Sequence, residues 1–92
     1  MDNLIHSRYA HLDSVVMHFL EAGGGEDAVL LLHGIPQSSH CWRRIIPSLA
    51  SHYRVIAPDL RGLGDTSRPH SGYDKKTVAA DLAQLLSTHL GI

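Results

Sequence analysis

The sequence predicts an α/β fold with a mixed, mostly parallel sheet, and three patterns along the chain favour it. A polar segment at 6–12 and a segment rich in β-branched and aromatic residues at 15–20 flank a short turn, which predicts an antiparallel hairpin. Two short apolar runs, 28–32 and 53–58, are bounded by turn residues, as is typical of buried parallel strands. A segment with helical spacing follows each run, so the predicted order is β-β-β-α-β-α.

The first predicted helix begins at a serine cap, Ser38 or Ser39, and places four large apolar side chains on one face. These side chains are Trp42, Ile45, Ile46 and Leu49. Pro47 lies inside this pattern and lacks a backbone N–H, so we expect the helix to kink or split near Ile46.

The last predicted helix begins at Asp74, a good N-cap, and Gly91 is placed to terminate it. Its apolar stripe consists of Val78, Leu82, Leu85, Leu86 and Leu90. Asp81, Gln84 and Thr88 are expected to lie away from that stripe.

Length and composition restrict the function classes. The 92 residues suffice for one small domain with a marginal core. The net charge is −1 with both signs scattered, which argues against nucleic-acid binding. The single cysteine, Cys41, fits a reducing compartment, and the longest apolar run, 28–32, is too short to cross a bilayer. We therefore expect a cytoplasmic protein that uses no membrane and no nucleic acid.

The strongest local motif is the turn His33-Gly34-Ile35-Pro36, directly after the first apolar run. Ligands of open α/β sheets bind beyond the carboxyl ends of parallel strands, and a glycine there lets the backbone approach closely. Backbone N–H groups in such a turn can stabilise a developing negative charge. A purely structural strand-to-helix turn is the alternative.

A second motif, residues 59–69, follows the second parallel strand at the same sheet edge. Asp59 and Arg61 are close enough in sequence to pair, or to bond the loop backbone. Gly62 and Gly64 permit positive φ. These four residues favour a structural loop over direct catalysis.

Together the two motifs resemble the α/β-hydrolase superfamily. The shared pattern is a strand ending in His-Gly-X-Pro, a helix bearing Trp42, and a strand ending in Asp-X-Arg-Gly-X-Gly. The segments 17–23 and 72–82 are also similar, so the resemblance extends over residues 6–92 and implies the N-terminal portion of that fold. The closest subgroup is that of epoxide hydrolases and fluoroacetate-type haloacid dehalogenases.

The resemblance implies a role for residues around the first turn. The backbone N–H of Ile35 would contribute to an oxyanion hole formed with His33, Gly34 and Pro36. Haloalkane dehalogenases often carry asparagine at the position of Ile35, so this residue argues against them.

Three downstream residues, Gln37, His40 and Trp42, look like the fluoroacetate dehalogenase branch and are substrate-pocket candidates. Each also has an ordinary interpretation, as a turn amide, a surface histidine and a core tryptophan.

The resemblance also implies what the sequence lacks. The family nucleophile follows the helix that ends near Gly91, in a Gly-X-(Ser/Asp)-X-Gly turn that this sequence does not contain, and the family's acid and base come later still. We therefore expect residues 1–92 to be one incomplete domain, inactive alone, that binds a small-molecule substrate only within a complete enzyme. No cofactor is implied, and the histidines lack paired zinc spacing.

Two alternatives remain open. Within the enzymes, an aspartate nucleophile is preferred narrowly over a serine esterase. Outside them, the chain is a non-catalytic module that self-associates through an unpaired strand, Val29 to Leu32, and hydrolyses nothing.

Overall fold

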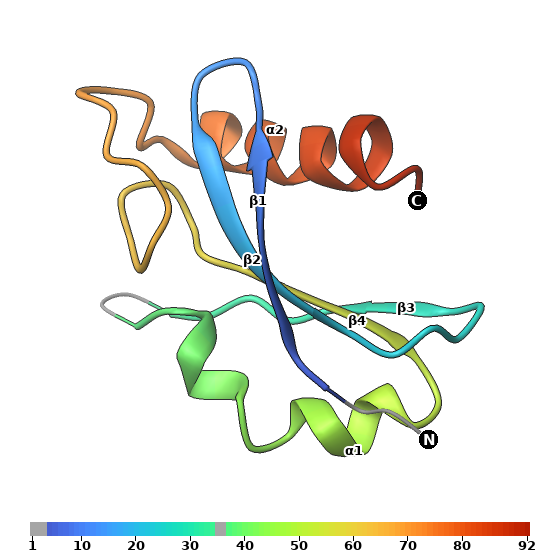
Figure 1. Ribbon diagram of the computed structural model, residues 1–92. Helices are drawn as coiled ribbons and strands as arrows, with labels where there is room; N and C mark the ends of the chain where they lie inside the picture. The colour runs from blue at the N-terminus through green and yellow to red at the C-terminus, as the bar shows by residue number, and fades with distance from the viewer. Residues whose placement is uncertain (1–3, 35–36) are drawn as a thin grey trace.

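The computed structural model describes residues 4–34 and 37–92, in which a four-stranded mixed sheet lies between two layers of helix (Figure 1). The strands are β1 (His6–His11), β2 (Val16–Ala22), β3 (Ala28–Leu30) and β4 (Arg54–Pro58), in the spatial order β1-β2-β4-β3. The hairpin and both later strands therefore lie where the sequence predicts them, but β3 ends at Leu30 and not at Leu32.

The pairing directions correct one expectation. β1 pairs with β2 and β2 with β4 in antiparallel fashion, and only β3 and β4 are parallel. The sheet is mixed, as predicted, but it is not mostly parallel in the described residues. The reason is that the hairpin supplies half of the strands.

The first helical segment is split, as Pro47 predicts. The 3₁₀ helix η1 (Ser39–Trp42) is capped by the Ser38 hydroxyl, and helix α1 (Ile46–Ala50) begins with the proline in its first turn. Proline is tolerated there because the first N–H groups of a helix have no intrahelical acceptor.

The last helical segment consists of α2 (Lys75–Ala83) and a π-helical continuation, η2 (Gln84–His89). The Asp74 carboxylate accepts a hydrogen bond from the Thr77 N–H, which confirms the predicted N-cap. Gly91 has a φ of 70°, as expected of a helix terminator.

Each face of the sheet packs on one helical layer. Ile56 of β4 points into a core with Met17 and Phe19, which the leucines of α2 and η2 cover. Its neighbours Val55 and Ala57 point to the opposite face, against η1 and α1. This alternation is the period-two pattern of a strand buried on both faces.

Three expectations about burial were wrong. Ile45, expected on the apolar face of the first helix, is 43% exposed because the helix is split and this residue lies between η1 and α1. The first apolar run is not buried on both faces: Ala28 is exposed, Val29 and Leu30 are half-buried, and Leu32 is 44% exposed. The reason is that β3 is an edge strand with only one described neighbour. Asp81 does not lie on the solvent side of its helix but is buried against Arg61.

No helix in ranges 4–34 and 37–92 is both long enough and apolar enough to span a membrane.

Candidate functional site

The turn after β3 is held by a histidine whose two ring nitrogens are both used. His33 is buried, and its Nε2 accepts a hydrogen bond from the Leu60 N–H at 3.0 Å. Because Nε2 is an acceptor, the ring N–H is at Nδ1, which faces the Gly34 carbonyl oxygen at 2.9 Å. His33 thus links the loops that follow β3 and β4, and in this state it has no free nitrogen to act as a base.

Gln37 closes the other side of the same turn. Its backbone N–H donates to the Gly34 carbonyl at 2.8 Å, and its side-chain Oε1 faces the Gly34 N–H at 3.3 Å. The Gly34 N–H is therefore already engaged. Ile35 and Pro36, the other two residues of the predicted oxyanion hole, lie outside the described residues.

A cavity of about 360 Å³ lies beside this turn, at the carboxyl ends of β3 and β4. Its wall is mainly apolar, and it is formed by the two loops and by α2. The residues that line it are Leu32, Leu60, Arg61, Leu63, Tyr73, Lys75, Val78, Ala79 and Leu82. This is the sheet end at which α/β proteins bind ligands.

Asp59 fixes the loop at that sheet end through backbone N–H groups, while the described ion pair of Arg61 is with Asp81. Its Oδ1 accepts from the Ser39 N–H at 2.6 Å, and its Oδ2 accepts from the Asp65 N–H at 3.0 Å. Burial alone would raise the pKa of Asp59, but the hydrogen bonds from Asp65, Ser39 and His18 outweigh it and hold the pKa below 3.8. Of the two alternatives for this residue, bonding of the loop backbone is the one observed.

His18 is a buried polar residue that sequence reasoning missed. It lies on β2 and is 5% exposed, with its Nδ1 at 2.7 Å from the Asp59 Oδ2 and its Nε2 at 2.6 Å from the Ser7 hydroxyl. In the sequence it is one polar residue inside an apolar strand pattern. Its partners are 11 and 41 residues away in the sequence, so they could not be predicted from it. The one indication in the sequence is a histidine at a position where the strand pattern predicts an apolar residue.

Arg61 forms a buried ion pair with Asp81 of α2. Its Nε and one terminal nitrogen donate to the two carboxylate oxygens at 2.9 and 2.8 Å. Further N–H groups reach the Ser71 carbonyl and the Ser14 hydroxyl. The hydrogen bonds to Asp81 raise the pKa of Arg61. Arg61 therefore connects its loop, α2 and the hairpin turn.

Both predicted loop glycines have positive φ, 78° at Gly62 and 54° at Gly64. A Cβ at Gly64 would overlap the Asp59 carboxylate, and one at Gly62 would overlap the Tyr73 ring. Gly64 is therefore needed for close approach as well as for backbone conformation, whereas at Gly62 the positive φ is the constraint, because the Tyr73 ring is exposed.

The two remaining pocket candidates do not meet in the apolar cavity. His40 is exposed and lines a separate cavity beside His18 and Asp59. Trp42 packs against the core cluster that includes Ile46 and Ala50 of α1, and its indole N–H is buried without a hydrogen-bond acceptor among the described residues.

One cluster in the described part of the chain has the spacing of a metal site. Ligand atoms of His18, Asp59 and Asp65 lie within 4.8 Å of one another. The His18 ring and the Asp59 carboxylate already bond protein groups, so an ion would have to displace those bonds. The cluster is better described as a hydrogen-bond network.

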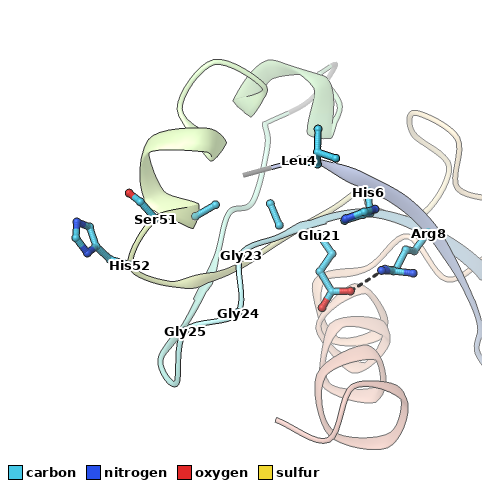
Figure 2. A pocket seen from close by; sticks show the side chains of 11 residues that line it. Leu4, His6, Arg8, Glu21, Gly23, Gly24, Gly25, Ser51 and His52 are labelled. Carbon is cyan, nitrogen blue, oxygen red and sulfur yellow. Dashed lines mark ion pairs between the residues drawn. The ribbon is translucent and has the colours of Figure 1, made fainter. Parts of the chain in front are cut away.

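A further cavity, of about 520 Å³, lies at the opposite end of the sheet, around residues 22–25 and 50–52 (Figure 2). Glu21 at its rim is paired with Arg8 and with Arg54, each at 2.9 Å. β3 and β4 begin near this end. It is thus remote from the turn where the sequence motifs converge.

Residues 27–92 match the family model described as alpha/beta hydrolase fold. The chain is 50% identical over 91 residues to a soluble epoxide hydrolase of Corynebacterium sp. (strain C12), covering 99% of this chain and 31% of that protein. It is 44% identical over 71 residues to a fluoroacetate dehalogenase of Burkholderia sp., covering 72% of this chain and 23% of that protein.

Solved structures agree with this similarity. The epoxide hydrolase VrEH1 from Vigna radiata superposes with a TM-score of 0.88 at 40% identity, over 96% of this chain and 29% of that one. The chain thus spans under a third of the length of the relatives that it matches.

Proposed function

Because the chain belongs to the α/β-hydrolase fold family, we propose that it forms the N-terminal wall of a hydrolase active site, with the turn after β3 supplying an oxyanion-binding N–H. The observation that carries this proposal is the His33 bridge between the Gly34 carbonyl and the Leu60 N–H. A donor contributes most to catalysis when it is held in place before the reaction begins. The bridge fixes the turn at the carboxyl ends of β3 and β4, beside the apolar cavity.

The donor in this proposal is the Ile35 N–H, as the family resemblance implies. The Gly34 N–H is less suitable because Gln37 already engages it. The apolar cavity beside Leu32 and Leu60 would hold the uncharged part of the substrate.

The proposed chemistry is nucleophilic substitution followed by hydrolysis. A carboxylate attacks an epoxide or halogen-bearing carbon and forms an ester, while the epoxide C–O bond opens and its oxygen takes a proton from the acid, or the carbon–halogen bond breaks and halide leaves. Water then cleaves the ester through an oxyanion that the turn stabilises, which releases the alcohol and restores the carboxylate. The nucleophile, the acid and the base have no counterpart in residues 1–92 in this proposal, so they come from additional sequence. The relatives named as epoxide hydrolase and fluoroacetate dehalogenase support this substrate class over a serine esterase.

A chimeric enzyme tests the proposal. The matching first third of the Corynebacterium epoxide hydrolase is replaced by this chain, and diol formation from an epoxide is measured. We expect an active chimera, and we expect Ile35→Pro, which removes the backbone N–H, to lower its kcat by about 10²–10³-fold. Ile35→Val keeps the N–H and is the matched control. A folded chimera without activity, or equal activity of both variants, would contradict the proposal.

Self-association is a second candidate function, and the asymmetry of the sheet edges favours it. β1 carries His6, Arg8 and His11 along its edge, whereas the edge strand β3 continues into Leu31 and the exposed Leu32. An apolar unpaired edge is a template for pairing with another chain, and charged residues blunt such pairing. Size-exclusion chromatography that shows a clean monomer would count against this candidate.

A further inference from the structure

A continuous chain of hydrogen bonds joins three different segments through Ser7, His18 and Asp59. The Ser7 hydroxyl lies 2.6 Å from His18 Nε2, and His18 Nδ1 lies 2.7 Å from Asp59 Oδ2. Ser7 is exposed on β1, whereas His18 and Asp59 are buried. A nucleophile bonded to a base, which is in turn oriented by a buried carboxylate, is the arrangement that activates a serine.

The protonation pattern agrees with this use. The Asp59 carboxylate is stabilised as an anion by the Ser39 and Asp65 N–H groups, so it accepts the His18 Nδ1 proton. Nε2 is then the unprotonated nitrogen and accepts from the Ser7 hydroxyl. This is the tautomer that can remove a proton from Ser7.

The histidine is also held firmly. Its backbone N–H donates to the Thr66 hydroxyl, which itself donates to the Asp59 carbonyl, and its ring lies against Tyr9 with centroids 5.1 Å apart. A cavity of about 370 Å³ adjoins this chain of hydrogen bonds, and its wall includes Ser7, His18 and His40. There is thus room for a small acyl group beside the hydroxyl.

We propose that Ser7 is an activated nucleophile that accepts an acyl group from activated carboxylic esters. The Ser7 oxygen bonds to the carbonyl carbon, its proton moves to His18 Nε2, the bond to the leaving oxygen breaks, and that oxygen takes the proton from His18. The product is an acyl-Ser7 ester and the released alcohol or phenol. This reactivity is independent of the proposed hydrolase wall, since it uses neither the Ile35 turn nor a nucleophile from additional sequence.

The probe is p-nitrophenyl acetate, added to the 92-residue chain, with phenol release followed by absorbance and the acylated residue mapped by mass spectrometry. We expect a burst of about one equivalent of phenol per chain without sustained turnover, and an acetyl group on Ser7. A positioned base raises the rate of nucleophilic attack roughly 10²–10⁴-fold. Because Ser7→Ala removes the nucleophile that benefits from the base, the size of the phenol burst should fall at least about tenfold in this variant.

Ser51→Ala is the matched control, because Ser51 is exposed but its hydroxyl donates to a backbone carbonyl rather than to a histidine. We expect this variant to retain the burst. His18→Gln, checked for folding by circular dichroism, should lose it.

Absence of a burst, acylation of other residues at the same rate, or a burst that survives Ser7→Ala in a folded chain would overturn the proposal. None of these outcomes bears on the chimera, whose activity depends on a different nucleophile.

Discussion

The Asp59 carboxylate combines burial with three accepted hydrogen bonds, from Ser39, Asp65 and His18. These bonds are weakened when the carboxylate is protonated, because a carboxylic acid accepts them less well. One residue thus connects β2, the start of η1 and the loop after β4. At this scale, one buried carboxylate joins three segments of the fold.

Acidification should therefore weaken the fold through Asp59. Its folded pKa lies below 3.8, so its contribution to the free energy of unfolding is present above about pH 4 and is lost as pH falls through the folded pKa. Denaturant unfolding followed by Trp42 fluorescence at several pH values measures this loss.

Asp59→Asn should flatten that pH dependence and lower stability near pH 7 by about 3 kcal/mol, because hydrogen bonds to a charged group are lost and the new amide opposes two donors. Asp74→Asn removes a second described carboxylate with a lowered pKa, at an exposed cap, and is the control. An Asp59→Asn variant with an unchanged acid profile would be inconsistent with this role.

At the scale of elements, local sequence patterns predicted the features that depend on residues close together in the chain. The split at Pro47, the cap at Asp74 and the hairpin all depend on residues within one turn or one strand pair, and the structure confirms them. Asp81 and His18 were not predicted because their partners lie 20 and 41 residues away, and helical or strand periodicity carries no information about a loop that folds back. The same limit applies to the candidate site: its turn was predictable, whereas the hydrogen bonds that hold it were not.

The loop after β4 is attached to α2 mainly through Arg61 and Asp81. Both side chains are at most 5% exposed, so removal of one charge leaves the other buried and unpaired. We expect Asp81→Asn to lower the free energy of unfolding by about 3–5 kcal/mol, a large part of what a domain of this size has. Chemical denaturation monitored by circular dichroism measures the change.

The double variant Arg61→Met, Asp81→Leu is the informative comparison, since an apolar pair of similar volume often replaces a buried ion pair with little loss. It should recover much of the stability that Asp81→Asn loses. Equal instability of the single and double variants would show that the hydrogen bonds from Arg61 to Ser71 and Ser14 matter more than the ion pair.

At the scale of the whole molecule, the sequence pattern predicted the layers and order of elements but not which strand lies at the edge. A run of five apolar residues looks the same whether one or two strands pair with it. Strand order depends on long-range pairing, and here it leaves β3 with β4 as its one described neighbour. The resulting apolar edge is continuous with the cavity beside Leu32.

Pairing of two copies through this edge predicts a concentration-dependent dimer that a charge at Leu32 disrupts. Leu32 is 44% exposed and belongs to neither core cluster, so Leu32→Lys should leave the fold intact while placing an unpaired charge in the interface. We expect the dimer dissociation constant, measured by light scattering during size-exclusion chromatography, to rise at least about tenfold, which corresponds to about 1.4 kcal/mol. Ile92→Lys, at a residue that is 49% exposed and is not part of β3, should leave the dissociation constant unchanged. If the unmodified chain is monomeric at every concentration, or if both variants weaken the dimer equally, the β3 edge is not the contact surface.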